Sequence, residues 1–140
     1  MQRTSMRKQL TIILSLLFFM SGCSNRNTPQ NVAEDFVHNY YQRANQEAAL
    51  LWSDSLAADK LRDEIELVRT VRRPGEMPSE MPEILFEMLT QRTNDENQVF
   101  FNYQLTIKNS SSSTSTRNVV IITELIDEHW KVINFDEYDE

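Results

Sequence analysis

The sequence contains few of the residue types that build recognisable catalytic sites. It has one cysteine, Cys23, and two glycines, Gly22 and Gly75, among its 140 residues. A single cysteine excludes a disulfide within the chain, and the residues after Cys23 offer no thiol nucleophile and no thiolate metal site. With so few glycines there is no glycine-rich phosphate loop and no G-x-S-x-G nucleophile motif. A domain of this composition must be held together by its hydrophobic core.

The sequence also lacks an apolar run long enough to span a membrane. Its longest run, Leu10–Met20, has 11 residues, whereas a spanning helix needs about 20. Three basic residues precede this run, and the small residues Ser21 and Gly22 follow it. A basic head, a short apolar segment and small residues before a cleavage point indicate an export signal.

The segment Met20-Ser21-Gly22-Cys23 resembles the lipobox of bacterial lipoproteins. The resemblance implies that residues 1–22 are a signal peptide and that Cys23 carries lipid on its thiol and its new amino group. An ordinary signal peptide with an incidental cysteine is the alternative. In enteric-type lipoproteins, a residue other than Asp after the cysteine implies transfer to the outer membrane, so Ser24 would be the sorting residue. We therefore expect a lipid-anchored protein on the periplasmic face of the outer membrane.

Cleavage before Cys23 would leave 118 residues, enough for one domain. We divide them into a polar lipidated tether (23–27), a domain (28–136) and an acidic tail (137–140). This part of the chain contains all 21 acidic residues but only 11 of the 14 basic ones, which gives a net charge of −10. Such a charge repels nucleic acid and anionic headgroups. Membrane attachment would therefore depend on the acyl chains of Cys23.

Apolar residues at helical spacing predict helices in the first half of the domain. Thr28-Pro29 is a typical helix start, with Thr as N-cap and Pro at the first helical position. A second short helix is expected at 47–52. A third is expected from a cap at 53–55 to about Val71. The stripe of the first helix consists of Val32, Ala33, Phe36, Val37, Tyr40, Tyr41 and Ala44.

The second half has the pattern of β-strands. Strands are expected at 84–93, 99–108, 119–126 and 130–135, although the first could also be a helical turn. The serine- and threonine-rich segment 110–116 is expected to be a flexible loop. In the last strand, Trp130, Val132 and Asn134 would share one face. Helices followed by consecutive strands predict an α+β fold, in which helices cover one face of a four-stranded antiparallel meander.

The opening helical segment TPQNVAEDFVHNYYQRANQEAALL and the closing HWKVINF resemble, in layout, the cystatin-like, nuclear-transport-factor-2-like superfamily. The resemblance covers about Thr28 to Phe135 and implies a curved sheet around a long helix, forming a cone with a cavity. On this basis the cavity would be lined by Phe36, Tyr40, Tyr41 and Trp130. The superfamily includes isomerases, dehydratases, scaffolds and immunity proteins, so the fold alone does not select a function.

Enzymes of this superfamily place an Asp base or a His–Asp pair, with a Tyr donor, inside the apolar cavity. His38 lies roughly 140° from the centre of the apolar face of its helix and should point to water. We expect no catalytic residue, no cofactor and no metal. Thioether binding of Cu(I) by Met77, Met81 and Met88 has no Cys or His to support it. The catalytic candidates implied by the resemblance are Asp35, His38, Tyr40, Tyr41, Asp54 and Tyr103.

The leading functional hypothesis is a non-catalytic, membrane-anchored envelope lipoprotein that binds a protein partner or a small apolar ligand. The alternatives are a small lyase or isomerase that uses the cone cavity, and an immunity-type or structural envelope protein. Arg69, Arg72 and Arg73 could bind a phosphate or the carboxylates of a partner, or simply cap a helix end. Trp130 is expected to be buried against an aromatic residue of the first helix.

Overall fold

The computed structural model describes residues 26–71, 80–95 and 97–138, and it confirms the α+β fold. The signal segment, Cys23, Ser24, Arg72, Arg73 and Met77 lie outside the described residues. Helices α2 (Pro29–Val37), η2 (His38–Gln42), α3 (Gln46–Leu50) and α4 (Ser55–Val71) precede strands β1 (Glu83–Asp95), β2 (Gln98–Lys108), β3 (Thr114–Ile126) and β4 (His129–Tyr138). The strands form one antiparallel meander in the order β1-β2-β3-β4.

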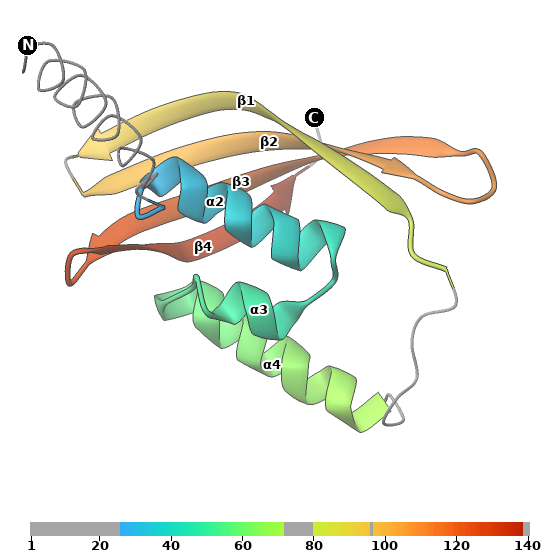
Figure 1. Ribbon diagram of the computed structural model, residues 1–140, viewed down its shortest axis with the longest axis horizontal. Coiled ribbons are helices and arrows are strands. Elements are labelled where there is room, and N and C mark those ends of the chain that lie inside the picture. Colours follow the sequence, from blue (N-terminus) through green and yellow to red (C-terminus); the bar gives the residue numbers. More distant parts are fainter. Residues whose placement is uncertain (1–25, 72–79, 96, 139–140) are drawn as a thin grey trace, which may run out of the picture.

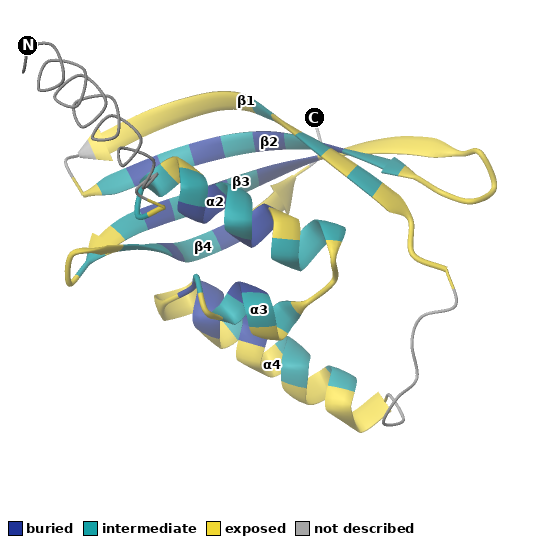
Figure 2. Ribbon diagram, in the orientation of Figure 1, coloured by how far each residue is buried: buried dark blue, intermediate teal, exposed yellow. Residues whose placement is uncertain are grey.

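The helices cover one face of the curved sheet (Figure 1). Helix α2 contacts β2, β3 and β4, whereas α4 contacts β4 and α3. Residues coloured as buried lie on α2, β2 and β3, where the helices cover the sheet (Figure 2). In β2 the buried residues alternate with partly exposed ones, as the sequence pattern predicted. They are Val99, Phe101, Tyr103 and Leu105.

Helix α2 begins as the sequence predicted, because the Thr28 side chain accepts a hydrogen bond from Asn31 N and Pro29 occupies the first turn. Beyond Val37 the chain widens into the π-helix η2, in which Arg43 N donates to His38 O. A π turn adds one residue to the helical repeat. The consecutive residues Tyr40 and Tyr41 both pack against the core from this turn.

Strand β4 contains a bulge that the sequence pattern did not predict. Ile122 pairs with Asn134 and Thr123 pairs with Val132, so Ile133 has no partner in the register. The extra residue shifts the alternation of side chains by one position. Phe135, rather than Asn134, therefore follows Val132 on the buried face, and the prediction that Asn134 shares this face was wrong.

Two predicted boundaries also differ from the structure. Thr114, Ser115 and Thr116 belong to β3, where they pair with Lys108, Ile107 and Thr106, so the exposed loop is shorter than predicted. Backbone pairing can extend a hairpin beyond the core, because it satisfies N–H and C=O groups without buried side chains. For the same reason β4 continues to Tyr138, so residues 137 and 138 belong to the sheet rather than to a separate tail.

Trp130 is only partly buried, and its ring is in none of the aromatic pairs observed among the described residues. The expected contact with the first helix is made instead by Phe135, whose ring centroid lies 4.9 Å from those of Phe36 and Tyr40. The bulge at Ile133 explains why Phe135 points inward, whereas Trp130 precedes the bulge and lies close to the β3–β4 turn.

We predict that Phe135→Ala lowers the free energy of unfolding by about 3–5 kcal/mol, the range for truncating a buried large aromatic. Phe135 is 6% exposed. Trp130→Ala should cost clearly less, because Trp130 is only partly buried. Urea denaturation of the two variants beside the wild type measures both changes. Equal losses of stability would contradict this assignment of the core.

Candidate functional site

Three of the four residues predicted to line the cavity form one aromatic cluster. Phe36 is fully buried, and its ring centroid lies 5.5 Å from that of Tyr40. Tyr40 in turn lies 4.7 Å from Tyr41, in an edge-on arrangement. Phe135 closes the cluster from β4. The space between α2 and β4 is thus occupied by rings of the protein itself.

A carboxylate borders this cluster. The Tyr40 hydroxyl donates to Glu64 of α4, at 2.8 Å from Oε1 and 3.0 Å from Oε2. Burial and then this hydrogen bond raise the pKa of Tyr40 well above its usual range. Burial raises the pKa of Tyr41 and of Tyr103 as well. All three phenols are therefore neutral at physiological pH.

The remaining catalytic candidates do not join the cluster as a His–Asp pair. His38 is exposed, as its helical angle predicted, and its Nδ1 lies 2.7 Å from Gln42 Oε1. Asp54 is exposed at the start of α4, where its Oδ1 accepts from Ser55 N. Asp35 is half-buried on α2. In the part of the chain that the structure describes, no group of three His, Cys, Asp or Glu residues could hold a metal ion.

Trp130, the fourth predicted residue, lies elsewhere. It lines a groove of about 280 Å³ that we call the tryptophan groove. This groove brings together Trp52, from the α3–α4 connection, and Trp130, from the start of β4; these are the only two tryptophans of the chain. The other lining residues are Arg26, Asn27, Val32, Leu51, His129 and Lys131.

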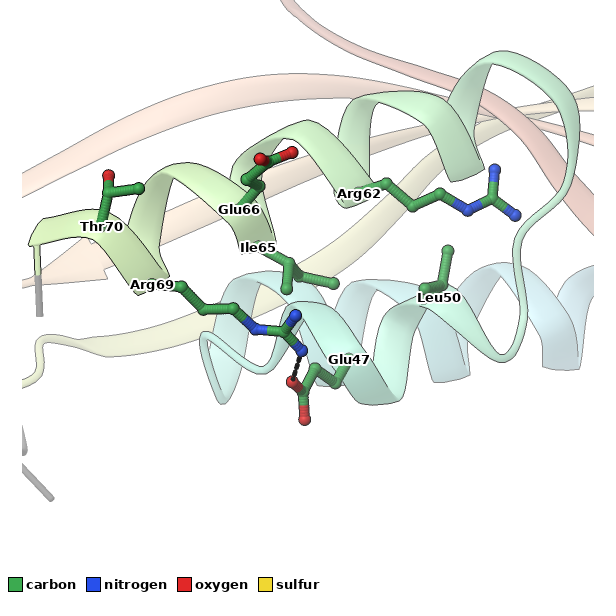
Figure 3. Close-up of a pocket in the computed structure, with 7 residues that line it drawn as sticks. All are labelled: Glu47, Leu50, Arg62, Ile65, Glu66, Arg69 and Thr70. Atoms are coloured by element: carbon green, nitrogen blue, oxygen red, sulfur yellow. Dashed lines mark hydrogen bonds and ion pairs between the residues drawn. The ribbon is translucent and has the colours of Figure 1, made fainter. Parts of the chain in front are cut away.

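A larger groove of about 680 Å³ lies between α3 and α4 (Figure 3). Leu50 and Ile65 provide its apolar centre, and an ion pair of 3.3 Å joins Glu47 Oε1 to Arg69 across it. Arg62, Glu66 and Thr70 complete the rim. We call this surface the α3–α4 groove. Arg69, one of the three arginines considered for anion binding, is therefore paired within the protein.

Several of these residues were missed by sequence reasoning. Glu64 gave no signal, because a carboxylate on a charged helix is typical of a solvated face. Trp52 is 78 residues away from Trp130 in the sequence, and only the folded chain brings the two together. Asn27 was assigned to the tether, yet its side chain bonds to the β3–β4 hairpin. Such long-range contacts have no local sequence signature.

None of the helices in the described part of the chain combines the length and hydropathy that a membrane crossing requires. The sequence matches no protein-family model and no curated protein. Its structure is similar to that of an NTF-2 like protein of unknown function from Shewanella oneidensis, with 11% identity and a TM-score of 0.56. That match covers 80% of this chain and 100% of the other.

A second similar structure is a ketosteroid isomerase-like protein from Erwinia carotovora. It has 9% identity and a TM-score of 0.52, and the match covers 81% of this chain and 95% of the other. At such low identity the likeness concerns the fold alone. Together with the observed topology, it shows that this chain has the nuclear-transport-factor-2-like fold, in which a curved antiparallel sheet wraps around a helix.

Proposed function

We propose that this protein is a lipid-anchored lipoprotein of the bacterial envelope, which catalyses no reaction and binds a protein partner through the α3–α4 groove. The observation that carries the proposal is the groove itself. It has an apolar centre of Leu50 and Ile65 with charges of both signs around it. Protein interfaces commonly combine an apolar centre with a polar rim.

A protein partner suits this groove better than a small molecule does. Small-molecule sites are concave, mostly apolar and bury most of the ligand. Here four of the seven lining residues are charged, and they project from two helices at the surface. Helix α4 also exposes Leu67 and Val71, which are 65% and 74% accessible. Neither residue lines the groove, so they add exposed apolar surface to the same helix outside it.

The interior of the fold supports a non-catalytic role. The rings of Phe36, Tyr40 and Phe135 contact one another and fill space between the first helix and the last strand. The Tyr40 hydroxyl is committed to Glu64. Because these rings fill the space, the interior is also poorly suited to bind a small apolar ligand.

The anchor is tested by replacing its attachment atom. We predict that Cys23→Ser abolishes the incorporation of a palmitate analogue and leaves the signal segment uncleaved, because the lipidated thiol is the proposed substrate for processing. Metabolic labelling and the electrophoretic mobility of the protein measure the two effects. Equal labelling of the variant and the wild type would refute lipid attachment at Cys23.

Fractionation tests which membrane carries the protein. With Ser24 after the cysteine, the wild type should enter the outer-membrane fraction of a sucrose gradient in a host with two membranes. Ser24→Asp is the matched variant, and it should shift the protein to the inner-membrane fraction. Recovery of the wild type with the inner membrane would contradict the proposed location.

The partner is tested by photo-crosslinking in intact cells. A photoreactive residue at Thr70, in the α3–α4 groove, should give a discrete adduct, whereas one at the exposed Ser111 of the β2–β3 loop should not. Arg69→Glu should suppress the adduct, because it places a second carboxylate next to Glu47. The repulsion between them changes the charge and the shape of the groove. The fold should tolerate this change, since an exposed ion pair contributes at most about 1 kcal/mol. No adduct from Thr70, or equal adducts from both positions, would contradict the proposal.

A further inference from the structure

The tryptophan groove lies where the chain leaves the domain toward Cys23. The Asn27 side chain holds the chain in position here, because its Nδ2 donates to Glu128 O at 2.7 Å and its Oδ1 accepts from Trp130 N at 2.8 Å. Both bonds join the segment before α2 to the β3–β4 hairpin. The path of the chain is therefore tied to the rim of the groove, four residues after Cys23.

This short distance limits how far the groove can be from a membrane that holds lipid on Cys23. Four extended residues span roughly 13 Å. The headgroup layer of one leaflet is about 5–7 Å thick, given a hydrocarbon core of about 30 Å within a bilayer of about 40–45 Å. Asn27 then lies at most about 8 Å above the headgroups when the tether is straight, and closer when it is not.

The chemistry of the groove suits such a place. Tryptophan is enriched at the level of the lipid headgroups, where its ring meets apolar chains and its N–H meets polar groups. Leu51 is 73% exposed beside the two tryptophans. Leu125, which pairs with Trp130 across the hairpin, is 36% exposed. This end of the domain therefore presents apolar side chains to its surroundings.

The charge of the groove differs from that of the rest of the chain. Its described lining residues include Arg26 and Lys131 but no acidic residue, although acidic residues outnumber basic ones in the sequence by 21 to 14. Lys131 Nζ donates to Leu51 O at 2.8 Å and forms no ion pair among the described side chains. Asp127 and Glu128 flank the groove in the adjacent turn. Two cations inside the groove and two carboxylates beside it leave this region without the excess of acidic residues found in the whole sequence, so Arg26 and Lys131 can approach phosphate groups.

We propose that the tryptophan groove lies in the phospholipid headgroup layer of the membrane that carries the anchor, with Trp52, Trp130 and Leu51 at the apolar boundary and Arg26 and Lys131 near phosphates. This inference rests on the proposed lipid anchor at Cys23. It fixes the orientation of the domain. The C-terminal end of α4 lies at the opposite end of the molecule (Figure 1) and faces away from the membrane, where a partner can reach it.

The test uses the full chain, purified with its own lipid and reconstituted into vesicles of phosphatidylethanolamine and phosphatidylglycerol. The acyl chains carry bromine either near the headgroup or near the chain end. Because the chain has only two tryptophans, its fluorescence reports directly on the groove. Bromine near the headgroup should quench this fluorescence strongly, and bromine near the chain end should quench it less.

Leu51→Asp and Leu67→Asp form a matched pair, since both leucines are exposed but only Leu51 lines the tryptophan groove. Leu51→Asp should at least halve the quenching, and Leu67→Asp should leave it unchanged. Full quenching in Leu51→Asp would overturn the proposal. So would a wild type whose tryptophans are not quenched by either lipid, which is the result expected if the groove stayed in water or if an acyl chain of the anchor occupied it.

Flotation of the vesicles, measured on the same samples, separates this proposal from the anchor. Protein that does not float shows that the anchor has failed. In that case the free thiol of Cys23, the only cysteine, is coupled to a maleimide lipid and the quenching is measured again. Unquenched tryptophans in the coupled protein would overturn the seating of the groove, whereas quenching would support it even without natural lipidation.

Discussion

The packing of Phe135 against Phe36 and Tyr40 is the contact on which the rest of the structure depends. It joins the first helix to the last strand, and it exists because the bulge at Ile133 turns Phe135 inward. Lys60 of α4 adds to this junction, since its Nζ donates to Phe135 O at 2.8 Å and lies over the Phe135 ring. Phe135 of β4 thus contacts both the first helix, through Phe36, and α4, through Lys60. Without disulfides in this domain, such apolar contacts supply most of its stability.

This contact also shapes the proposed function, because a cone occupied by its own rings offers binding surfaces outside rather than inside. The two grooves described above lie between α3 and α4 and at the end of the domain where Arg26 and Asn27 precede the first helix. In the proposed arrangement, one end meets lipid and the other meets a protein partner. In that arrangement, the excess of acidic over basic residues in the sequence, 21 to 14, repels anionic headgroups from the rest of the domain.

The fold could be predicted from the sequence because its signals are local. Thr28-Pro29 marks a helix start, and the alternation in β2 marks a half-buried strand. The bulge at Ile133 has no comparable signal, since a shift of register is decided by what packs against the strand. The groove of Trp52 and Trp130 likewise depends on contacts across most of the domain. Prediction from periodicity therefore gave the helical layer and the sheet correctly. It was wrong about Trp130, which lines the tryptophan groove instead of packing against an aromatic residue of the first helix.

The most direct test of this account is a measurement of xenon binding by NMR, read from the methyl groups of Leu61 and Val132, which are fully buried. Xenon enters empty apolar cavities of the size that truncating a large side chain creates. The account predicts no saturable shift of these methyl signals in the wild type and a saturable shift in Phe135→Ala, where the missing ring leaves space. Saturable xenon binding at these methyl groups in the wild type would show an open cavity inside the cone and would contradict the account.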